Sequence, residues 1–349
     1  MRFAALAFRL GLFQACLGAL SVLTLGIFNR LLIDEFSVPA ALTALALGAQ
    51  QLVAFTRVWF GQRSDNCRWR GLRRTPFVLC GSLSFCVLFW IAGRTVLWLA
   101  EASQAGDGTA VLLRGLVLTV VFLGYGLAIS ASSTPFAALL VDVTSERQRP
   151  ALVSVVWSML TVGIVAGAIL ASRFLGTACA STDLDLVIAG VERLIVVAPL
   201  VIFGLILLAV VGVERPVDHQ SNDEKPAADR PTELSFGQAW TVLRASPQVA
   251  YFFGVLSLFT FSLFLQEAVL EPYGGAIFGM DVCATTRLNA IWGVGTLVGI
   301  ASTGFLLVPR LGPQRTALLG GVLAGVFVLL MVVAGAVVSE PLFRLALLL

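Results

Sequence analysis

The sequence predicts an all-α integral membrane protein that crosses the bilayer many times. Two observations lead to this fold class. Hydrophobic residues make up 58% of the 349 residues and charged residues only 12%, whereas roughly a quarter of the residues are charged in ordinary soluble domains. The apolar residues also gather in blocks longer than about 18 residues, which is the pattern of membrane-spanning helices. We therefore expect most of the apolar side chains to face lipid rather than the core of a soluble domain.

Nine apolar segments are long enough to cross about 30 Å of hydrocarbon at 1.5 Å per residue. In chain order they are residues 10–33, 38–60, 77–99, 111–141, 151–175, 187–213, 249–270, 288–308 and 316–338. A helix is expected for each, because an open strand would leave its backbone groups without hydrogen bonds in lipid. A further apolar run opens at Pro341 and is read as the start of a tenth span.

A long polar stretch divides these spans into six and three. Residues 214–247 contain the string ERPVDHQSNDEKPAADRPTE, which is polar and bears several prolines, so we expect a solvated linker. The predicted organisation is a six-helix N-terminal half over 1–213, the linker, and an incomplete C-terminal half over 248–349. This order resembles the 6+6 plan of the major facilitator superfamily, in which substrates bind between two pseudo-symmetric halves near the midplane.

The placement of arginine predicts the orientation of the spans. Basic residues crowd the loops after spans 2, 4 and 8 and the long linker: Arg63, Arg68, Arg70, Arg73, Arg74, Arg147, Arg149, Arg215, Lys225, Arg230, Arg244, Arg310 and Arg315. All of these lie on one side of the membrane if the spans alternate in direction. By the positive-inside rule, the N-terminus and the linker are therefore expected to be cytoplasmic.

The loop after the second span resembles a motif of the same superfamily. Residues 61–74 contain GQRSD and then GLRR, similar to the pattern G-x-x-x-D…G-R-R. Gly61 permits close helix approach, Asp65 can face the positive end of a helix dipole, and Arg73 and Arg74 can hold the surface through charge pairs. We expect a cytoplasmic latch here. The alternative is that these charges serve only the orientation of the spans.

Two further segments extend this expectation. Asp142 and Arg147, in the loop after the fourth span, are predicted to form a second part of the latch. The loop after the eighth span, PRLGPQR at 309–315, looks like a degraded repeat of the motif. A repeat of this kind is what two pseudo-symmetric halves imply.

Two carboxylates occupy the outer end of the seventh span. Glu267 and Glu271 are four residues apart and so share one face of a helix. A carboxylate in an apolar span costs about 2–3 kcal/mol on insertion scales and is a functional hypothesis by default. Pro272 is expected to end the helix, with the following Gly274-Gly275 pair making the turn.

The resemblance becomes specific at this segment. Four stretches are similar to the PucC/LhaA family, the bacteriochlorophyll-delivery branch of the major facilitator superfamily. They are QEAVLEPYGG and TTRLNAIWGVGTLVG at this segment, RLGLFQACLGALSVLTLGIFNRLLIDEFSVPA near the N-terminus and LGYGLAISASSTPFAALLVD in the middle. The form FNR…IDE at 28–35 looks most like the cyanobacterial members. The likeness covers nearly the whole chain.

The resemblance implies a membrane assembly factor, not an enzyme, that delivers or shelters chlorophyll or bacteriochlorophyll during assembly of light-harvesting or photosystem complexes. Pigment would be bound cargo, with no catalytic cofactor. Implied partners are membrane lipid, light-harvesting or photosystem polypeptides and the chlorophyll synthase machinery, but not nucleic acid. The implied location is the bacterial inner membrane or a thylakoid membrane. The twelve-span plan of the family would then be present as nine spans and a fraction.

Pigment chemistry directs attention to oxygen donors. The only histidine, His219, lies in the linker, so an intramembrane axial ligand to the magnesium of a chlorin must be another group, and hard oxygen donors suit magnesium. Glu267 is the favoured ligand. The competing interpretation pairs Glu267 or Glu271 with Arg30 across the outer end of the cavity. The predicted cavity residues are Asn29, Arg30, Gln50, Gln51, Gln266, Glu267, Glu271 and Tyr273.

Two other functions stay open at this point. A proton-coupled transporter of a small metabolite would use Glu267 or Glu271 as its protonation site. A pigment-free chaperone would grip antenna helices without binding chlorin. The sequence shows neither a nucleophile–base pair nor a phosphate-binding loop.

Overall fold

The computed structural model describes residues 3–29, 31–69, 71–175, 184–214, 246–280 and 282–348. These residues form helices and connecting turns, with one isolated bridge between Trp69 and Leu72 in place of any sheet. Eight helices of this part are long and apolar enough to cross a membrane. The predicted class, an all-α polytopic membrane protein, is confirmed. The chain forms two compact units, Met1–Asp218 and His219–Leu349.

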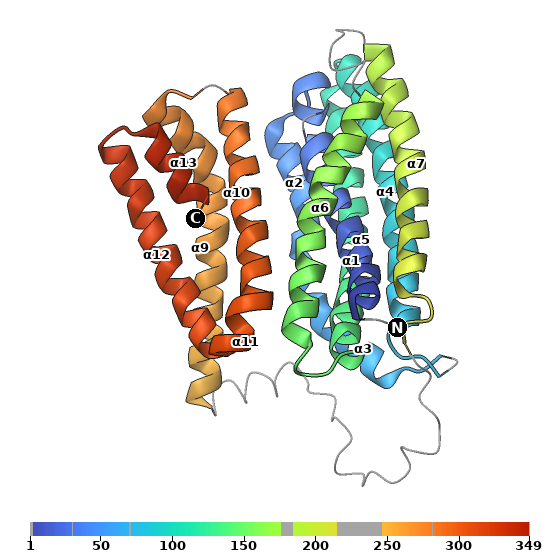
Figure 1. The fold of residues 1–349 in the computed structure, drawn as a ribbon. Helices are drawn as coiled ribbons and strands as arrows, with labels where there is room; N and C mark the ends of the chain where they lie inside the picture. The colour runs from blue at the N-terminus through green and yellow to red at the C-terminus, as the bar shows by residue number, and fades with distance from the viewer. Residues whose placement is uncertain are drawn as a thin grey trace. The chain divides into compact units, whose positions relative to one another are not determined.

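Unit 1 holds the first six spans (Figure 1). The first two are interrupted helices, and the other four are continuous. The first consists of α1 (Phe3–Ser21) and two π-helical stretches, η1 (Val22–Phe28) and η2 (Leu31–Glu35). The second consists of α2 (Ala40–Leu52), a 3₁₀ turn η3 (Ala54–Thr56) and α3 (Arg57–Asn66). The continuous spans are α4 (Thr75–Gln104), α5 (Gly108–Asp142), α6 (Arg149–Leu175) and α7 (Leu184–Val210).

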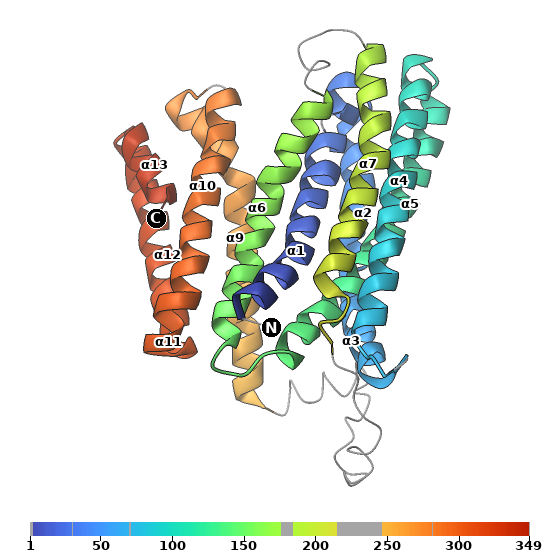
Figure 2. The same ribbon diagram turned by 45° about the vertical axis from the view of Figure 1, so that its right-hand side comes forward.

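Side-chain contacts show that the first and the last span of unit 1 run in opposite directions. The guanidinium of Arg9, near the start of α1, donates hydrogen bonds to the carbonyls of Leu208 (3.0 Å) and Val211 (2.7 Å) at the end of α7. These are the unpaired carbonyls of a helix C-terminus, where a cation is favourable. Figure 2 shows α1 running between α6 and α7, which both contact it.

Aromatic rings fill the centre of unit 1. Phe13 of α1 stacks on Phe136 of α5 with ring centroids 4.0 Å apart, and Phe28 stacks on Phe89 at 5.4 Å. Tyr125 of α5 is fully buried beside the rings of Phe85 and Phe122. Because lipid is as apolar as these side chains, close packing and dispersion hold the helices together more than any exclusion of water.

Glycines let α1 and α6 touch through their backbones. A Cβ at Gly163 of α6 would overlap the carbonyl oxygen of Ala15, and one at Gly18 of α1 would overlap the carbonyl oxygen of Leu160. Small residues in facing positions are the usual means by which membrane helices approach closely. The contact between these two helices is among the most extensive in the unit.

Unit 2 contains the remaining described helices. They are α9 (Pro247–Phe278), α10 (Val282–Ser302), the π-helical stretch η6 (Thr303–Leu307), α11 (Val308–Leu311), α12 (Pro313–Ala336) and α13 (Glu340–Leu348). A small core forms where Leu288, Ala334 and Phe343 are fully buried. Phe278 and Tyr273 pack their rings against Phe343.

The predicted end of the seventh helix at Pro272 is wrong. Helix α9 continues through Pro272 and the following glycines to Phe278, and Gly279 then turns the chain with a φ of +64°. Proline removes one backbone hydrogen bond, but membrane helices tolerate this where local adjustment and neighbouring groups satisfy the freed carbonyl. The turn is therefore made seven residues later, by a glycine in the left-handed region.

The backbone contact between α1 and α6 predicts the effect of a single methyl group. Gly163→Ala should lower the free energy of unfolding by about 1–3 kcal/mol, because the added carbon forces the two helices apart. Thermal unfolding in mild detergent measures this. The matched control is Gly204→Ala in α7, where a Cβ meets no atom within 4 Å and alanine is the better helix former. Equal melting temperatures for the two variants would contradict the assignment.

Candidate functional site

A charge cluster joins four helices at one end of unit 1. Arg74, just before α4, is only 8% exposed. Its guanidinium donates to the hydroxyl of Ser64 (2.7 Å) and to the carboxylate of Asp142 at the end of α5 (3.1 Å), and it pairs with Asp65 of α3. One buried guanidinium thus uses its several donors to connect α3, α4 and α5.

The fourth helix enters through Glu214, which follows α7. Its carboxylate accepts hydrogen bonds from the backbone N–H groups of Arg73 (2.7 Å), Arg74 (3.1 Å) and Thr75 (2.8 Å). These are N–H groups at the start of α4, which have no partner inside the helix. A carboxylate supplied from another helix therefore caps α4, and the helix dipole favours its negative charge.

The hydrogen bonds at this cap also determine how Glu214 titrates. Burial raises the pKa of the carboxyl, but the hydrogen bonds from Thr75, Arg73 and Arg74 together outweigh it and hold the pKa below its ordinary value of 4.5. Each of these N–H groups stabilises the ionised form. The capped arrangement is therefore the form present at neutral pH.

The structure brings together part of the predicted latch. Asp65, Arg74 and Asp142 are in contact, as described above. The backbone of Arg73 contributes to the cap, and a Cβ at Gly61 would lie 3.3 Å from the Thr134 methyl of α5. Arg147 is exposed in the loop between α5 and α6. Its place in the latch stays a prediction.

Glu214 was not predicted to belong to this cluster. It is the first residue after the sixth apolar block, and composition assigned it to the linker. The sequence did contain one signal. Glu214 carries a negative charge, whereas the loops predicted to lie on the same side of the membrane carry mostly positive charges.

A second site is a polar pocket inside unit 1, with a volume of about 180 Å³. Three spans form it: the first, the second and α5. It is lined by Leu17, Ser21, Thr24, Leu25, Gln50, Gln51, Arg57, Tyr125, Gly126 and Ile129. Two of the predicted cavity residues, Gln50 and Gln51, are therefore on its wall.

Both neighbouring spans are interrupted at this pocket. Thr24 and Leu25 belong to the π-helical stretch η1, and Gln51 and Arg57 flank the 3₁₀ turn η3. Such departures from α-helical geometry in membrane spans occur where they line a cavity, and π-helical turns are common at functional sites. Gly126 of α5 makes the approach possible, because a Cβ there would overlap the carbonyl oxygen of Gln50.

The polar groups of the pocket are only partly satisfied by the protein. The amide of Gln50 donates to the carbonyl of Leu47 (3.1 Å), and Tyr125 lies next to Thr24. Among the described residues, no carboxylate lies within ion-pair distance of Arg57. A guanidinium without a counter-ion inside a membrane span is a donor for an oxygen-bearing ligand or for lipid headgroups.

The other predicted cavity residues do not gather here. Asn29 is exposed beyond the pocket wall, and Tyr273 packs on Phe278 and Phe343 within unit 2. Arg30 lies outside the described residues, as do the side chains of Gln266, Glu267 and Glu271. Within the described part of the chain, no group of three or more His, Cys, Asp or Glu residues could hold a metal ion.

The protein is a polytopic α-helical membrane protein, because its helices are long and apolar enough to cross a bilayer and enclose a pocket between their spans. The family model described as "PUCC protein" matches residues 27–349, and the chain belongs to this family. It is 32% identical over 333 residues to the "Bacteriochlorophyll synthase 44.5 kDa chain" of Rhodobacter capsulatus, covering 94% of this chain and 70% of that protein.

Two further relatives carry the family's name. "Protein PucC" of Rhodovulum sulfidophilum is 29% identical, with 96% of this chain and 71% of the relative covered. "Protein PucC" of Rhodobacter capsulatus is 28% identical, with 88% and 64% covered. The chain thus spans about two thirds of the length of these relatives.

The cap by Glu214 predicts a pH-dependent stability. The folded-state pKa lies below the unfolded value, so the contribution of the cap is fully present above about pH 4.5 and is lost as pH falls through the lower, folded value. Glu214→Gln should lower the free energy of unfolding by about 1 kcal/mol at pH 7, since the carboxylate is only half-buried. Unfolding followed from pH 7 to pH 3 should show a shallower slope for this variant.

Glu146→Gln is the matched control, because Glu146 is an exposed carboxylate in the loop between α5 and α6. It should leave both the stability and its pH dependence unchanged. A Glu214→Gln profile parallel to that of the wild type would show that the cap does not titrate as proposed.

Proposed function

We propose that this protein is a membrane assembly factor that delivers or shelters chlorophyll or bacteriochlorophyll while light-harvesting or photosystem complexes are assembled. Membership of the PUCC family supports this role. A relative named as a chain of bacteriochlorophyll synthase supports a connection to pigment. In this proposal the protein binds pigment as cargo and catalyses no reaction. Its N-terminus is cytoplasmic, in the bacterial inner membrane or a thylakoid membrane.

The observation that carries the proposal is the polar pocket at the interrupted spans. A chlorin is an apolar macrocycle with carbonyl groups on its rim, so it needs an apolar site with a few hydrogen-bond donors. Gln51 and Arg57 supply such donors at the wall. The volume of about 180 Å³ is below the ~300–1,000 Å³ of pockets that enclose a whole drug-sized ligand. The pocket therefore accepts the edge of a pigment rather than all of it.

The charge cluster has a separate part in this proposal. Arg74 and Glu214 join α3, α4, α5 and α7 at the end that the arginine distribution places in the cytoplasm. In the proposed role they act as the latch that keeps this end of unit 1 closed. The pocket lies along the same second span, where Gln50 and Gln51 precede the turn η3 and Arg57 follows it.

Glu267 remains the proposed axial ligand of the pigment's magnesium, and its pairing with Arg30 remains the alternative. If Glu267 is the ligand, Glu267→Gln should lower the amount of pigment that co-purifies, whereas unchanged co-purification would rule this role out. Arg30→Gln separates the two interpretations, because it removes the charge that the alternative pairs with Glu267 and leaves the carboxylate in place. Pigment co-purification should persist in this variant if Glu267 is the ligand.

The proposed function is tested by purifying the protein in mild detergent from a pigment-producing host and recording its absorption spectrum. Chlorin bands at near-stoichiometric amounts are expected. A colourless protein that retains antenna polypeptides would instead indicate a pigment-free chaperone. Proton-coupled uptake of a small metabolite into vesicles would indicate a secondary transporter.

The pocket predicts that Arg57 contributes to pigment binding. Arg57→Leu should lower pigment occupancy about tenfold, because a hydrogen bond from a charged donor contributes ~1.5–3 kcal/mol. The comparison is Arg63→Leu, an exposed arginine on the following turns of α3. The ratio of chlorin absorption to protein measures occupancy. Equal ratios for the two variants would place the pigment elsewhere.

A further inference from the structure

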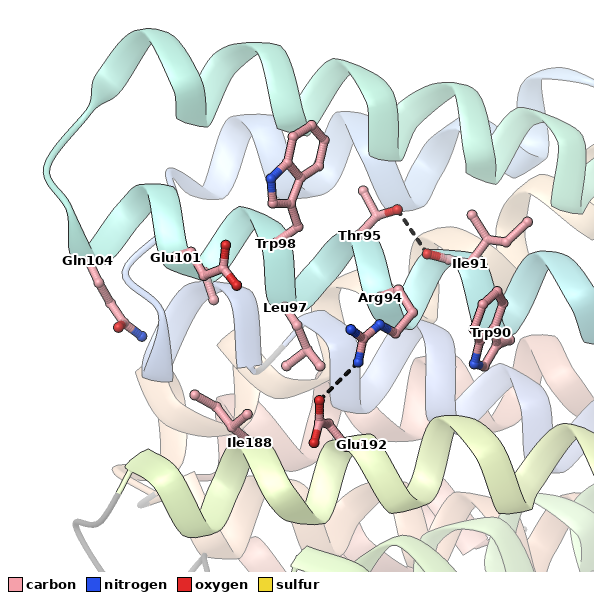
Figure 3. A pocket seen from close by; sticks show the side chains of 11 residues that line it. Trp90, Ile91, Arg94, Thr95, Leu97, Trp98, Glu101, Gln104, Ile188 and Glu192 are labelled. Carbon is pink, nitrogen blue, oxygen red and sulfur yellow. Dashed lines mark hydrogen bonds and ion pairs between the residues drawn. The ribbon is translucent and has the colours of Figure 1, made fainter.

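A groove between α4 and α7 contains an ion pair (Figure 3). The guanidinium of Arg94 on α4 donates to Oε1 of Glu192 on α7 at 2.9 Å. Both side chains are about half exposed, 54% and 51%. The groove has a volume of about 450 Å³ and is lined by Trp90, Ile91, Arg94, Thr95, Leu97, Trp98, Ala100, Glu101, Gln104, Ile188 and Glu192.

The pair lies within the apolar length of both helices. Arg94 is roughly 7 Å along the axis from the middle of α4, and Glu192 roughly 8 Å from the middle of α7, at 1.5 Å per residue. Half of the hydrocarbon layer is about 15 Å thick. A helix centred in the bilayer therefore places both groups within the hydrocarbon, and both remain exposed on the surface of unit 1.

Ionised side chains at this depth almost always face a bundle interior and mark functional positions. Here the helices are held so that the pair stays together. Gly93, next to Arg94, lets α7 approach α4, because a Cβ there would overlap the side chain of Ile195. The ion pair compensates the two charges but leaves polar atoms uncovered. Among the described residues, Oε1 of Glu192 accepts from Arg94, and no hydrogen bond reaches Oε2.

Depth and shape restrict what could cover this carboxylate. A lipid headgroup belongs at the boundary of the hydrocarbon, several ångströms further out. A volume of about 450 Å³ lies within the ~300–1,000 Å³ of small-molecule pockets. The ligand expected here is therefore membrane-soluble, mainly apolar, and able to bind a carboxylate oxygen.

We propose that this groove is a lateral binding site for a magnesium chlorin, with Oε2 of Glu192 as the axial ligand of the magnesium and Arg94 as the residue that positions and counters the carboxylate. Magnesium prefers hard oxygen ligands, carboxylate among them. The apolar side chains of Leu97 and Ile188 beside Glu192, and the indole of Trp90 beside Arg94, offer surface for the macrocycle. Binding donates one lone pair of the carboxylate to the metal, and no bond of the pigment breaks.

The outer end of the groove is bounded by a different set of charges. Arg114 of α5 lies 4.5 Å from the centre of the Trp98 ring and 3.7 Å from a carboxylate oxygen of Glu101. The side chain of Glu101 is 74% exposed, two turns nearer the end of α4 than Arg94. It lines the same groove but lies closer to the end of the helix, and its carboxylate has Arg114 as a partner.

This inference rests on the proposed function, and one experiment separates the two. The purified chain in mild detergent is titrated with chlorophyll a, a magnesium chlorin, and with pheophytin a, its magnesium-free counterpart. Binding is followed by absorption and by resonance Raman bands that report the coordination of the magnesium. Glu192→Gln should weaken chlorophyll binding about tenfold and leave pheophytin binding unchanged, whereas Glu146→Gln, an exposed carboxylate outside the groove, should leave both unchanged.

Glu192→His provides the second variant, since imidazole is also a ligand for the metal. It should restore chlorophyll binding with an altered axial-ligand signature, a result that a purely structural role of Glu192 would not produce. Arg94→Gln should shift the same Raman bands. Melting temperatures show whether each variant folds.

Three other outcomes would contradict either this site or the proposed function. If the wild type binds chlorophyll and neither Glu192→Gln nor Glu192→His changes its affinity or its Raman bands, this site is wrong while the proposed function stands. If the wild type binds neither pigment, the proposed function itself fails. If Glu192→Gln instead releases a bound membrane polypeptide at unchanged pigment affinity, the groove is a helix-docking surface and the pigment site is overturned.

Discussion

Unit 1 depends on the direct backbone contact between α1 and α6. In a bilayer, apolar side chains gain little by leaving lipid for one another, so helices must approach until many atoms touch. Gly18 and Gly163 make this approach possible from both sides. The aromatic pairs around Phe13 and Phe28 then fill the space that this contact leaves between the neighbouring helices. Helix α1 also contacts α7, in part through Arg9, while α5 joins the second span and α4.

The polar groups of unit 1 are concentrated at three levels along the helices. The charge cluster of Arg74 and Glu214 is at one end, and the pocket with Gln51 and Arg57 lies between the first two spans and α5. The pair Arg94–Glu192 lies in the half of α4 and α7 that is farther from the charge cluster. At the end, water and backbone N–H groups can share the charges. Within the spans each charged group needs a partner or a ligand: Glu192 is paired with Arg94, whereas Arg57 has no carboxylate within ion-pair distance among the described residues.

Hydropathy predicted the fold class because the length of an apolar block is a direct response to bilayer thickness. The loop motif indicated Asp65 and Arg74, and the loop after the fourth span indicated Asp142; the structure places both aspartates in contact with Arg74. Hydropathy could not show the breaks at η1 and η3, because their residues are as apolar as their neighbours. It also passed over Arg94 and Glu192, since single charges disappear in the average of a long apolar segment. Their pairing depends on two helices almost a hundred residues apart, which no local pattern records.

The turn η3 gives the second span the form of two rods joined at a weak point. The α-helical hydrogen-bond pattern is interrupted at Ala54–Thr56, and local opening concentrates where such hydrogen bonds are missing. The rod on one side of the joint is α3, which begins at Arg57 and includes Asp65, about 12 Å further along the axis. Arg57 lines the pocket and Asp65 holds Arg74. A force applied to Arg57 from within the membrane therefore acts on a short lever whose other end is part of the charge cluster.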